Sequence, residues 1–194
     1  MWDERYRISE YIYGKEPNTF FSSELSKLSV GKILLPGEGE GRNAVFAAQM
    51  GWNVHAFDAS IEGKKKALRL ADEKNVSIRY DLLKYDEFDV TESSYDAIGL
   101  FYTHQAPSER KAFHRRILKA LKQNGVLILE GFSKKQLQNM SGGPKNPDYL
   151  LSVQELEEDF GEMEIQMLHE LTRELSEGSS HRGIADLVQL VARK

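Results

Sequence analysis

The sequence has no cysteine and only 5 prolines among its 194 residues. The missing cysteines exclude disulfide bonds, a thiolate zinc site and a cysteine nucleophile. Long hydrophobic runs are also missing, because the longest stretch without Asp, Glu, Lys or Arg, residues 43–57, is shorter than the roughly 20 residues of a membrane helix. The first residues are charged and contain no apolar run of the signal-peptide type. We therefore expect a cytoplasmic protein that does not associate with membranes.

Neither sign of charge predominates, because 26 basic residues (Lys and Arg) stand against 30 acidic ones and give a net charge of −4. This balance is not typical of proteins that bind nucleic-acid phosphates. Residues 110–122 do contain six basic and no acidic side chains, but they lack the interleaved aromatic residues of an RNA-binding surface. We expect them to form a solvated helix face, and we do not expect nucleic acid as a partner.

Short apolar segments alternate with amphipathic ones through residue 130. We predict strands at residues 32–35, 53–57, 76–79, 97–101 and 126–129, with helices at 42–50 and 60–75 and a third helix capped by Ser108. Several strands are apolar on both faces, which is typical of a parallel sheet covered by helices on both sides. A capping box at Ser152 and Glu155 begins another helix, and two long strands follow near 164–175 and 183–192. The pattern predicts an α/β fold: a Rossmann-like three-layer sandwich whose seven-stranded, mostly parallel sheet ends in an antiparallel C-terminal hairpin.

The most informative segment is the glycine-rich turn at residues 37–41, Gly-Glu-Gly-Glu-Gly, between the first strand and the first helix. Such a turn lets a ligand approach the backbone and the free N–H groups of the following helix, although it also occurs as a plain strand-to-helix turn. Asp58 ends the second predicted strand and Asp81 follows the third. In such sheets ligands bind outside the carboxyl ends of the strands, and an acid at the position of Asp58 accepts hydrogen bonds from ribose. The arrangement predicts a site for adenosine.

The spacing of the glycines distinguishes among nucleotides. A dinucleotide fingerprint requires glycine where this chain has Arg42, and the Gly-Lys-Ser/Thr of a phosphate-binding P-loop is absent. The spacing fits S-adenosylmethionine (SAM) better than NAD, and an NAD-dependent reductase is the less favoured alternative.

Several segments together resemble a known family. They are residues 37–45 (GEGEGRNAV), 57–60 (FDAS), 95–98 (YDAI), 118–125 (LKALKQNG) and the lead-in 13–18 (YGKEPN). The chain resembles the class I SAM-dependent methyltransferases, and within them the compact bacterial branch of tellurite-resistance and thiopurine methyltransferases. The resemblance implies one domain over residues 1–194, with an N-terminal helical cap (1–30), a cofactor-binding half (31–130) and a substrate-side loop, helix and hairpin (131–194).

The resemblance also implies the ligands and their contacts. SAM is the expected cofactor and S-adenosylhomocysteine its product, with no metal and with a small-molecule or metalloid-type methyl acceptor. No feature predicts the oligomeric state. The residues expected to bind the cofactor are Tyr13, Gly37, Glu38, Gly39, Gly41, Arg42, Asn43, Asp58, Ala59, Asp81, Leu82, Phe101 and Tyr102.

One position departs from the family. An acid usually stands two residues before the first glycine, where it holds the amino-acid end of the cofactor, and this chain has Leu35 there. Glu38 or Glu40 is a candidate to compensate. The departure also keeps open a second function, that of a non-catalytic SAM-binding sensor or partner protein.

Methyl transfer depends largely on alignment and needs a general base only when the acceptor must lose a proton. His104, after the fourth strand, is the candidate for a base or for a group that orients the acceptor, and the alternative is a histidine that only binds its own loop. Residues 140–147 form either a substrate lid or a surface loop. We interpret His181 and Arg182 as part of a solvated hairpin loop.

Overall fold

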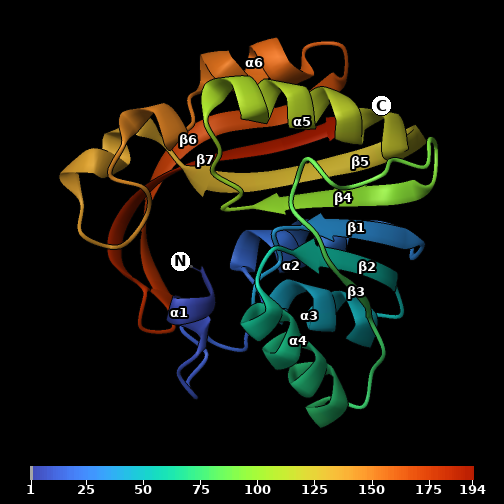
Figure 1. The fold of residues 1–194 in the computed structure, drawn as a ribbon. Helices are drawn as coiled ribbons and strands as arrows, with labels where there is room; N and C mark the ends of the chain where they lie inside the picture. Colours follow the sequence, from blue (N-terminus) through green and yellow to red (C-terminus); the bar gives the residue numbers. More distant parts are fainter. Residues whose placement is uncertain (1) are drawn as a thin grey trace.

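The computed structural model describes residues 2–194, and its seven strands form a single sheet (Figure 1). The strand order is β3-β2-β1-β4-β5-β7-β6. β1 to β5 run parallel, while β7 lies antiparallel to both β5 and β6. The predicted α/β fold with its antiparallel C-terminal hairpin is confirmed. The strands are β1 (Lys32–Pro36), β2 (Asn53–Asp58), β3 (Arg79–Leu82), β4 (Tyr95–Phe101), β5 (Leu121–Phe132), β6 (Glu164–Glu177) and β7 (His181–Arg193).

Helices cover both faces of this sheet. Figure 1 shows α2, α3 and α4 on one side and α5 and α6 on the other, with α1 near the far end of the β6–β7 hairpin. Their bounds are α1 (Trp2–Tyr6), α2 (Thr19–Leu25), α3 (Arg42–Gln49), α4 (Ile61–Glu73), α5 (Pro107–Ala120) and α6 (Val153–Phe160), and two short 3-10 helices, η1 (Lys134–Gln138) and η2 (Pro147–Tyr149), precede α6. No helix within residues 2–194 is long and apolar enough to cross a membrane.

Alternate side chains of the central strands enter two separate cores. Ile33 and Leu35 pack with α2, α3 and α4, whereas Leu34 packs with Phe57 and α5 on the other face. All of these side chains are at most 1% exposed, which explains why the strands are apolar at successive positions. At roughly 25 cal/mol per Å² of apolar surface, burial on both faces makes this sheet the main stabilising element.

The helix starts follow local capping. The Ser60 hydroxyl accepts a hydrogen bond from the Gly63 N–H at 3.1 Å, and the Ser152 hydroxyl accepts one from the Glu155 N–H at 3.3 Å. The predicted caps of α4 and α6 are therefore confirmed. The cap predicted at Ser108 is wrong, because α5 begins at Pro107 and its N-cap is Ala106, two residues earlier than predicted.

The third strand begins later than the predicted 76–79. Asn75, two residues after the end of α4, lies in the left-handed region (φ 56°), and the Val76 N–H donates to the Ala71 carbonyl at 3.0 Å. Residues 76–78 therefore complete the turn, and pairing with β2 starts only at Arg79 opposite His55. Asp81 consequently lies inside the strand rather than after it.

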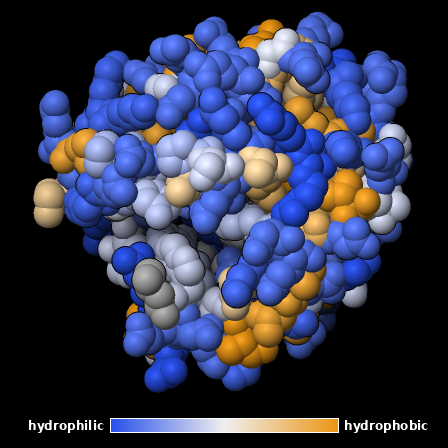
Figure 2. All heavy atoms as spheres, turned by 45° about the horizontal axis from the view of Figure 1, so that its top comes forward, coloured by the Kyte–Doolittle hydropathy of each residue, from blue (hydrophilic) through white to orange (hydrophobic). Residues whose placement is uncertain are grey.

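The uneven charge distribution along the sequence has a structural explanation. Arg110 of the basic helix α5 binds Asp159 of the acidic helix α6 at 2.8 Å, and Lys111 binds Glu158 at 3.0 Å. Arg110 is only 1% exposed, so the prediction of a solvated basic face is wrong at this residue. Figure 2, turned to bring this side of the molecule forward, shows mainly hydrophilic side chains over it.

Candidate functional site

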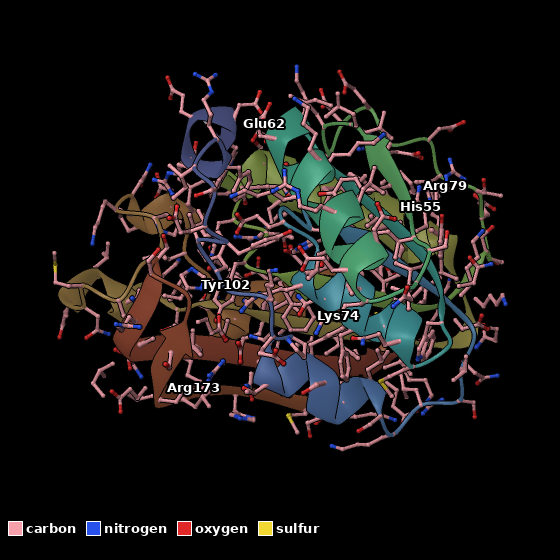
Figure 3. The ribbon with its side chains drawn as sticks, turned by 90° about the horizontal axis from the view of Figure 1, so that it is seen from below. His55, Glu62, Lys74, Arg79, Tyr102 and Arg173 are labelled. Carbon is pink, nitrogen blue, oxygen red and sulfur yellow. The ribbon has the colours of Figure 1, made fainter. Side chains whose placement is uncertain are left out.

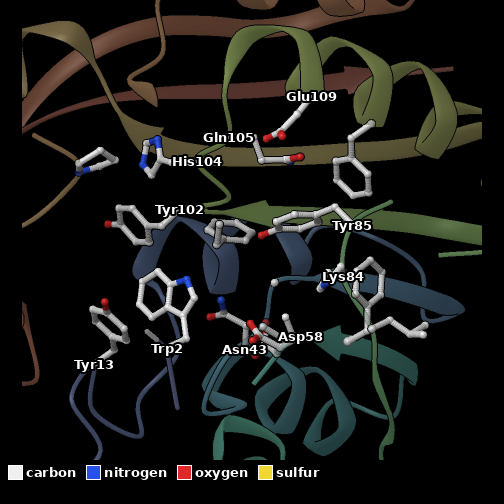
Figure 4. A pocket seen from close by; sticks show the side chains of 18 of the residues that line it. Trp2, Tyr13, Asn43, Asp58, Lys84, Tyr85, Tyr102, His104, Gln105 and Glu109 are labelled. Atoms are coloured by element: carbon white, nitrogen blue, oxygen red, sulfur yellow. The ribbon is translucent and has the colours of Figure 1, made fainter. Parts of the chain in front are cut away.

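A cavity of about 800 Å³ opens where β1, β2 and β4 end, within the size range of small-molecule sites. Figure 4 shows its two sides: Asn43, Asp58 and Tyr13 on one, and Tyr102, His104, Gln105 and Glu109 opposite, with Trp2 between them. Of the predicted cofactor residues, those that line it are Tyr13, Gly37, Glu38, Arg42, Asn43, Asp58, Ala59, Phe101 and Tyr102. The fold therefore brings predicted cofactor residues as far apart in sequence as Tyr13 and Tyr102 to the wall of the same cavity.

The glycine-rich turn forms the floor of the cavity at the end of β1. All three glycines have positive φ, with 63° at Gly37, 60° at Gly39 and 88° at Gly41. A Cβ atom at Gly37 would collide with the Tyr85 hydroxyl, so a side chain at this position would fill the space between the turn and Tyr85. Gly39 and Gly41 do not line the cavity, and they serve to shape the turn.

Asp58 is held in place by the backbone around it. Its carboxylate accepts hydrogen bonds from the Gly39 N–H at 3.1 Å and the Ser60 N–H at 2.8 Å. Burial nevertheless raises the pKa of Asp58 above its ordinary value, and these backbone bonds only partly oppose that effect. The side chain thus stands preorganised at the cavity wall, with lone pairs that can accept from a ligand.

The two glutamates of the turn have different surroundings. Glu40 is 3% exposed and pairs with Lys66 at 2.7 Å, so its charge is already balanced inside the protein. Glu38 lines the cavity and accepts a hydrogen bond from the Ala44 N–H at 2.7 Å. Burial raises the pKa of Glu38 to about 8. Leu35, at the position of the family's acid, is 1% exposed in the core, and of the two glutamates in the turn only Glu38 lines the cavity.

Asp81 and Leu82 do not line the cavity. The Asp81 carboxylate accepts hydrogen bonds from Arg79 at 2.7 Å, and it lies 2.9 Å from His55 Nε2 (Figure 3 labels both partners). Leu82 is 45% exposed. The next residues, Leu83, Lys84 and Tyr85, reach the cavity instead, because β3 extends three positions beyond its predicted end.

His104 lines the cavity but has both ring nitrogens engaged. Nδ1 lies 2.7 Å from the Tyr149 carbonyl, to which it must donate, and Nε2 accepts from the Phe132 N–H at 3.2 Å. Burial lowers the pKa of His104 to about 4, which keeps the ring neutral. Because the lone pair on Nε2 already accepts a backbone hydrogen bond, the structure favours the loop-binding role of His104 over that of a base.

His181 contradicts the interpretation as a solvated loop residue. It is 5% exposed, lines the cavity, and lies with its ring centre 4.4 Å from those of both Tyr13 and Tyr102. The β6–β7 strands extend to Glu177 and His181, which pair across the turn. Only Arg182 is exposed as expected. No local signal marks His181, because the rings that cover it come from distant segments.

A buried polar network lies beneath this end of the cavity. Glu130, 0% exposed, accepts hydrogen bonds from Asn18 at 2.6 Å, Arg173 at 2.8 Å and the Tyr102 hydroxyl at 3.1 Å. Glu177 pairs with Arg42 at 2.9 Å. Two arginines therefore balance two buried carboxylates, as buried charges require. Figure 3 shows that Tyr102 and Arg173 reach this network from different parts of the fold.

One buried group in the cavity wall has no partner. The Gln105 Nε2 has no hydrogen-bond acceptor among the described residues, although the side chain is only 6% exposed. A ligand with an acceptor atom would satisfy this donor, whose burial is otherwise unfavourable. The Gln105 amide, the glycine-rich turn and Asp58 together form a site whose residues fit a nucleoside ligand. Residues 2–194 contain no cluster of three His, Asp or Glu side chains that could hold a metal ion.

Comparisons with known proteins agree with this geometry. Residues 33–125 match the model of a family described as a methyltransferase domain. TehB from Haemophilus influenzae is 17% identical with a TM-score of 0.75 over all of this chain and 65% of its own. A protein that converts a disulfide bond into a thioacetal group in echinomycin biosynthesis is 19% identical (TM-score 0.74, all of this chain and 90% of that one). The N-methyltransferase NodS from Bradyrhizobium japonicum is 13% identical, with a TM-score of 0.66 over 91% of this chain and 98% of that one. No curated protein sequence matches the chain.

Proposed function

Because this chain contains a class I SAM-dependent methyltransferase domain, we propose that it methylates a small-molecule or metalloid-type acceptor by in-line displacement. The observation that supports this proposal most is the continuity of the cavity, which is lined at one end by Gly37 and Asp58 and at the other by Phe132 and His181. A donor site and an acceptor site within one space meet the requirement for alignment, from which much of the rate of such a transfer comes.

Bound SAM supplies a methyl group on a positively charged sulfonium sulfur. We propose that Asp58 accepts hydrogen bonds from the ribose hydroxyls and that the Gln105 amide donates to another polar atom of the ligand. Glu38 would take the place of the acid that is absent at Leu35 and accept from the ammonium group. The faces of Tyr13 and Tyr102 would attract the sulfonium cation.

The walls of the cavity limit the acceptor. Trp2 from α1, Gly143 and Pro144 from the loop before η2, and His181 from the hairpin border the same space. We propose that residues 31–130 bind the cofactor and that residues 1–30 and 131–194 enclose the acceptor. An enclosed space of about 800 Å³ that also holds a nucleoside favours a small acceptor over a macromolecule.

Calorimetric titration with SAM, followed by incubation with a panel of acceptors that includes thiols, phenols, amines and tellurite, tests the proposal. We expect SAM to bind, and S-adenosylhomocysteine to form with at least one acceptor. NAD is the control ligand, and it should not raise the melting temperature. SAM binding without turnover on any acceptor would instead support a sensor, and stabilisation by NAD alone would support a reductase.

A further inference from the structure

His181 occupies an aromatic corner of the cavity. Its ring centre lies 4.4 Å from Tyr13, 4.4 Å from Tyr102 and 5.2 Å from Phe132. These three rings come from the N-terminal segment, the residue after β4 and the end of β5. Flat apolar molecules stack favourably against such rings, so this corner is suited to an acceptor with a flat apolar body.

The polar contacts of His181 define which of its ring nitrogens carries the proton. Nδ1 lies 3.2 Å from Glu177 Oε2. Hydrogen bonds from His181 and Arg42 lower the pKa of Glu177 to about 2, even though its burial by itself raises it. An ionised carboxylate can only accept, so Nδ1 carries the proton and the lone pair lies on Nε2. Within residues 2–194, Nε2 has no hydrogen-bond partner.

The two histidines of the cavity therefore differ in their capacity for chemistry. The backbone occupies both nitrogens of His104. His181 has one nitrogen oriented by a carboxylate and the other available, which is the arrangement of a general base held by a positioning residue. Arg42 at 2.9 Å and Arg173 at 3.4 Å fix Glu177 from behind, so the carboxylate cannot rotate freely.

Resting on the methyl transfer proposed above, we propose that His181 is the catalytic base for an acceptor whose methylated atom is the oxygen of a hydroxyl group on a flat apolar ring. The O–H bond of the acceptor breaks, and its proton passes to Nε2. The electron pair released forms the new bond to the methyl carbon, while the bond from that carbon to sulfur breaks and leaves its electrons on S-adenosylhomocysteine. His181 then returns the proton to solvent, and Glu177 acts as its positioning residue.

The charged and titratable groups around His181 act in opposite directions, since the carboxylates favour its protonated form and Arg42 favours its neutral form. They are Glu177 and Arg173 of β6, Arg42 of α3, Glu130 of β5, Tyr13, Tyr102 and His104. Burial lowers the pKa of His181 below its ordinary value, although the Glu177 bond opposes this effect. The base is therefore unprotonated at neutral pH, and kcat should fall as the pH drops through the pKa of His181.

A catalytic base and a structural residue can be distinguished by comparing two acceptors that differ in whether they carry a proton at pH 7. Phenol keeps its proton at pH 7, whereas thiophenol is largely ionised and needs no base. We expect His181→Asn to lower kcat for phenol by about 100-fold, with KM little changed, and kcat for thiophenol by no more than about threefold. The matched control is His169→Asn, since His169 is exposed on β6 and should affect neither. An equal loss with both acceptors would show a structural role and overturn the proposal.

A measurement on the unchanged protein covers the case in which His181→Asn does not fold. Imidazole ¹⁵N spectra should show His181 with its proton on Nδ1, and added phenol should shift the Nε2 signal. A proton on Nε2 at pH 7 would overturn the proposal. If SAM binds and amines or tellurite are methylated but neither phenol nor thiophenol is, this inference fails and the proposed function stands. If SAM does not bind, the proposed function itself fails.

Discussion

Asp58 and Gly39 are joined by a hydrogen bond of 3.1 Å from the Gly39 N–H to the Asp58 carboxylate. This bond connects the end of β2 to the turn after β1, so one acidic side chain both shapes the glycine turn and faces the cavity. The ligand site and the local backbone are therefore coupled, and substitutions here test both.

Replacing Asp58 with alanine should weaken SAM binding. Loss of a charged hydrogen-bond acceptor costs about 1.5–3 kcal/mol, which corresponds to roughly a 10- to 100-fold higher Kd. Calorimetric titration measures the change, and Asp81→Ala is the matched control because Asp81 faces Arg79 and His55 outside the cavity. An unchanged Kd in Asp58→Ala would show that the ribose assignment is wrong.

SAM affinity should depend on pH through Glu38. Its pKa of about 8 means that the free protein holds a proton there at pH 7, and a cationic ligand favours the ionised form. Binding should therefore release a proton, and the affinity should increase as the pH rises from 6 towards 8. Titrations in buffers of different ionisation enthalpy measure this release. Glu38→Gln should bind more weakly and release no proton at this site, whereas undiminished release in that variant would contradict the assignment.

Gly41 and Gly51 permit a comparison of two effects on stability. Both have positive φ, 88° and 92°, but a Cβ atom at Gly41 would lie 2.5 Å from the Ala67 Cβ, whereas at Gly51 the nearest atom, on Val30, is 3.8 Å away. Gly51→Ala should lower the free energy of unfolding by about 1 kcal/mol through backbone strain alone. Gly41→Ala should lower it by about 3 kcal/mol because overpacking adds to that strain. Urea unfolding measures both, and equal losses would contradict the close packing of α4 on the turn.

His104 should contribute to the loss of stability in acid. Its pKa is about 4 in the folded protein and near 6.5 when unfolded, so between these values the unfolded chain binds more protons. The contribution is present above pH 6.5 and is lost as the pH falls towards 4. We expect about 1–2 kcal/mol, less than the full shift implies, because the ring is partly open to the cavity. His104→Asn should flatten the dependence of the unfolding free energy on pH over this range, and an unchanged slope would contradict the lowering of the His104 pKa by burial.

Much of the fold follows from local features of the sequence. Continuous apolar strands, the caps at Ser60 and Ser152, and the glycine-rich turn each depend on residues within a few positions of one another. The errors also arise locally: Asn75 permits an additional turn after α4, which delays β3 and moves Asp81 inside the strand, away from the cavity.

The sequence by itself determined the class of fold, the strand ends that border the cavity, and the position of Asp58, because parallel strands bring their carboxyl ends to one edge. Only the tertiary structure decided which titratable groups can act there. The choice between Glu38 and Glu40 depends on Lys66, and the choice between His104 and His181 depends on the Phe132 N–H, the Tyr149 carbonyl and Glu177. Lys66 lies far from Glu40 in sequence, the partners of His104 act through backbone atoms, and the rings that bury His181 come from distant segments. Burial and hydrogen bonding, which set pKa values and leave lone pairs free, exist only once the chain has folded.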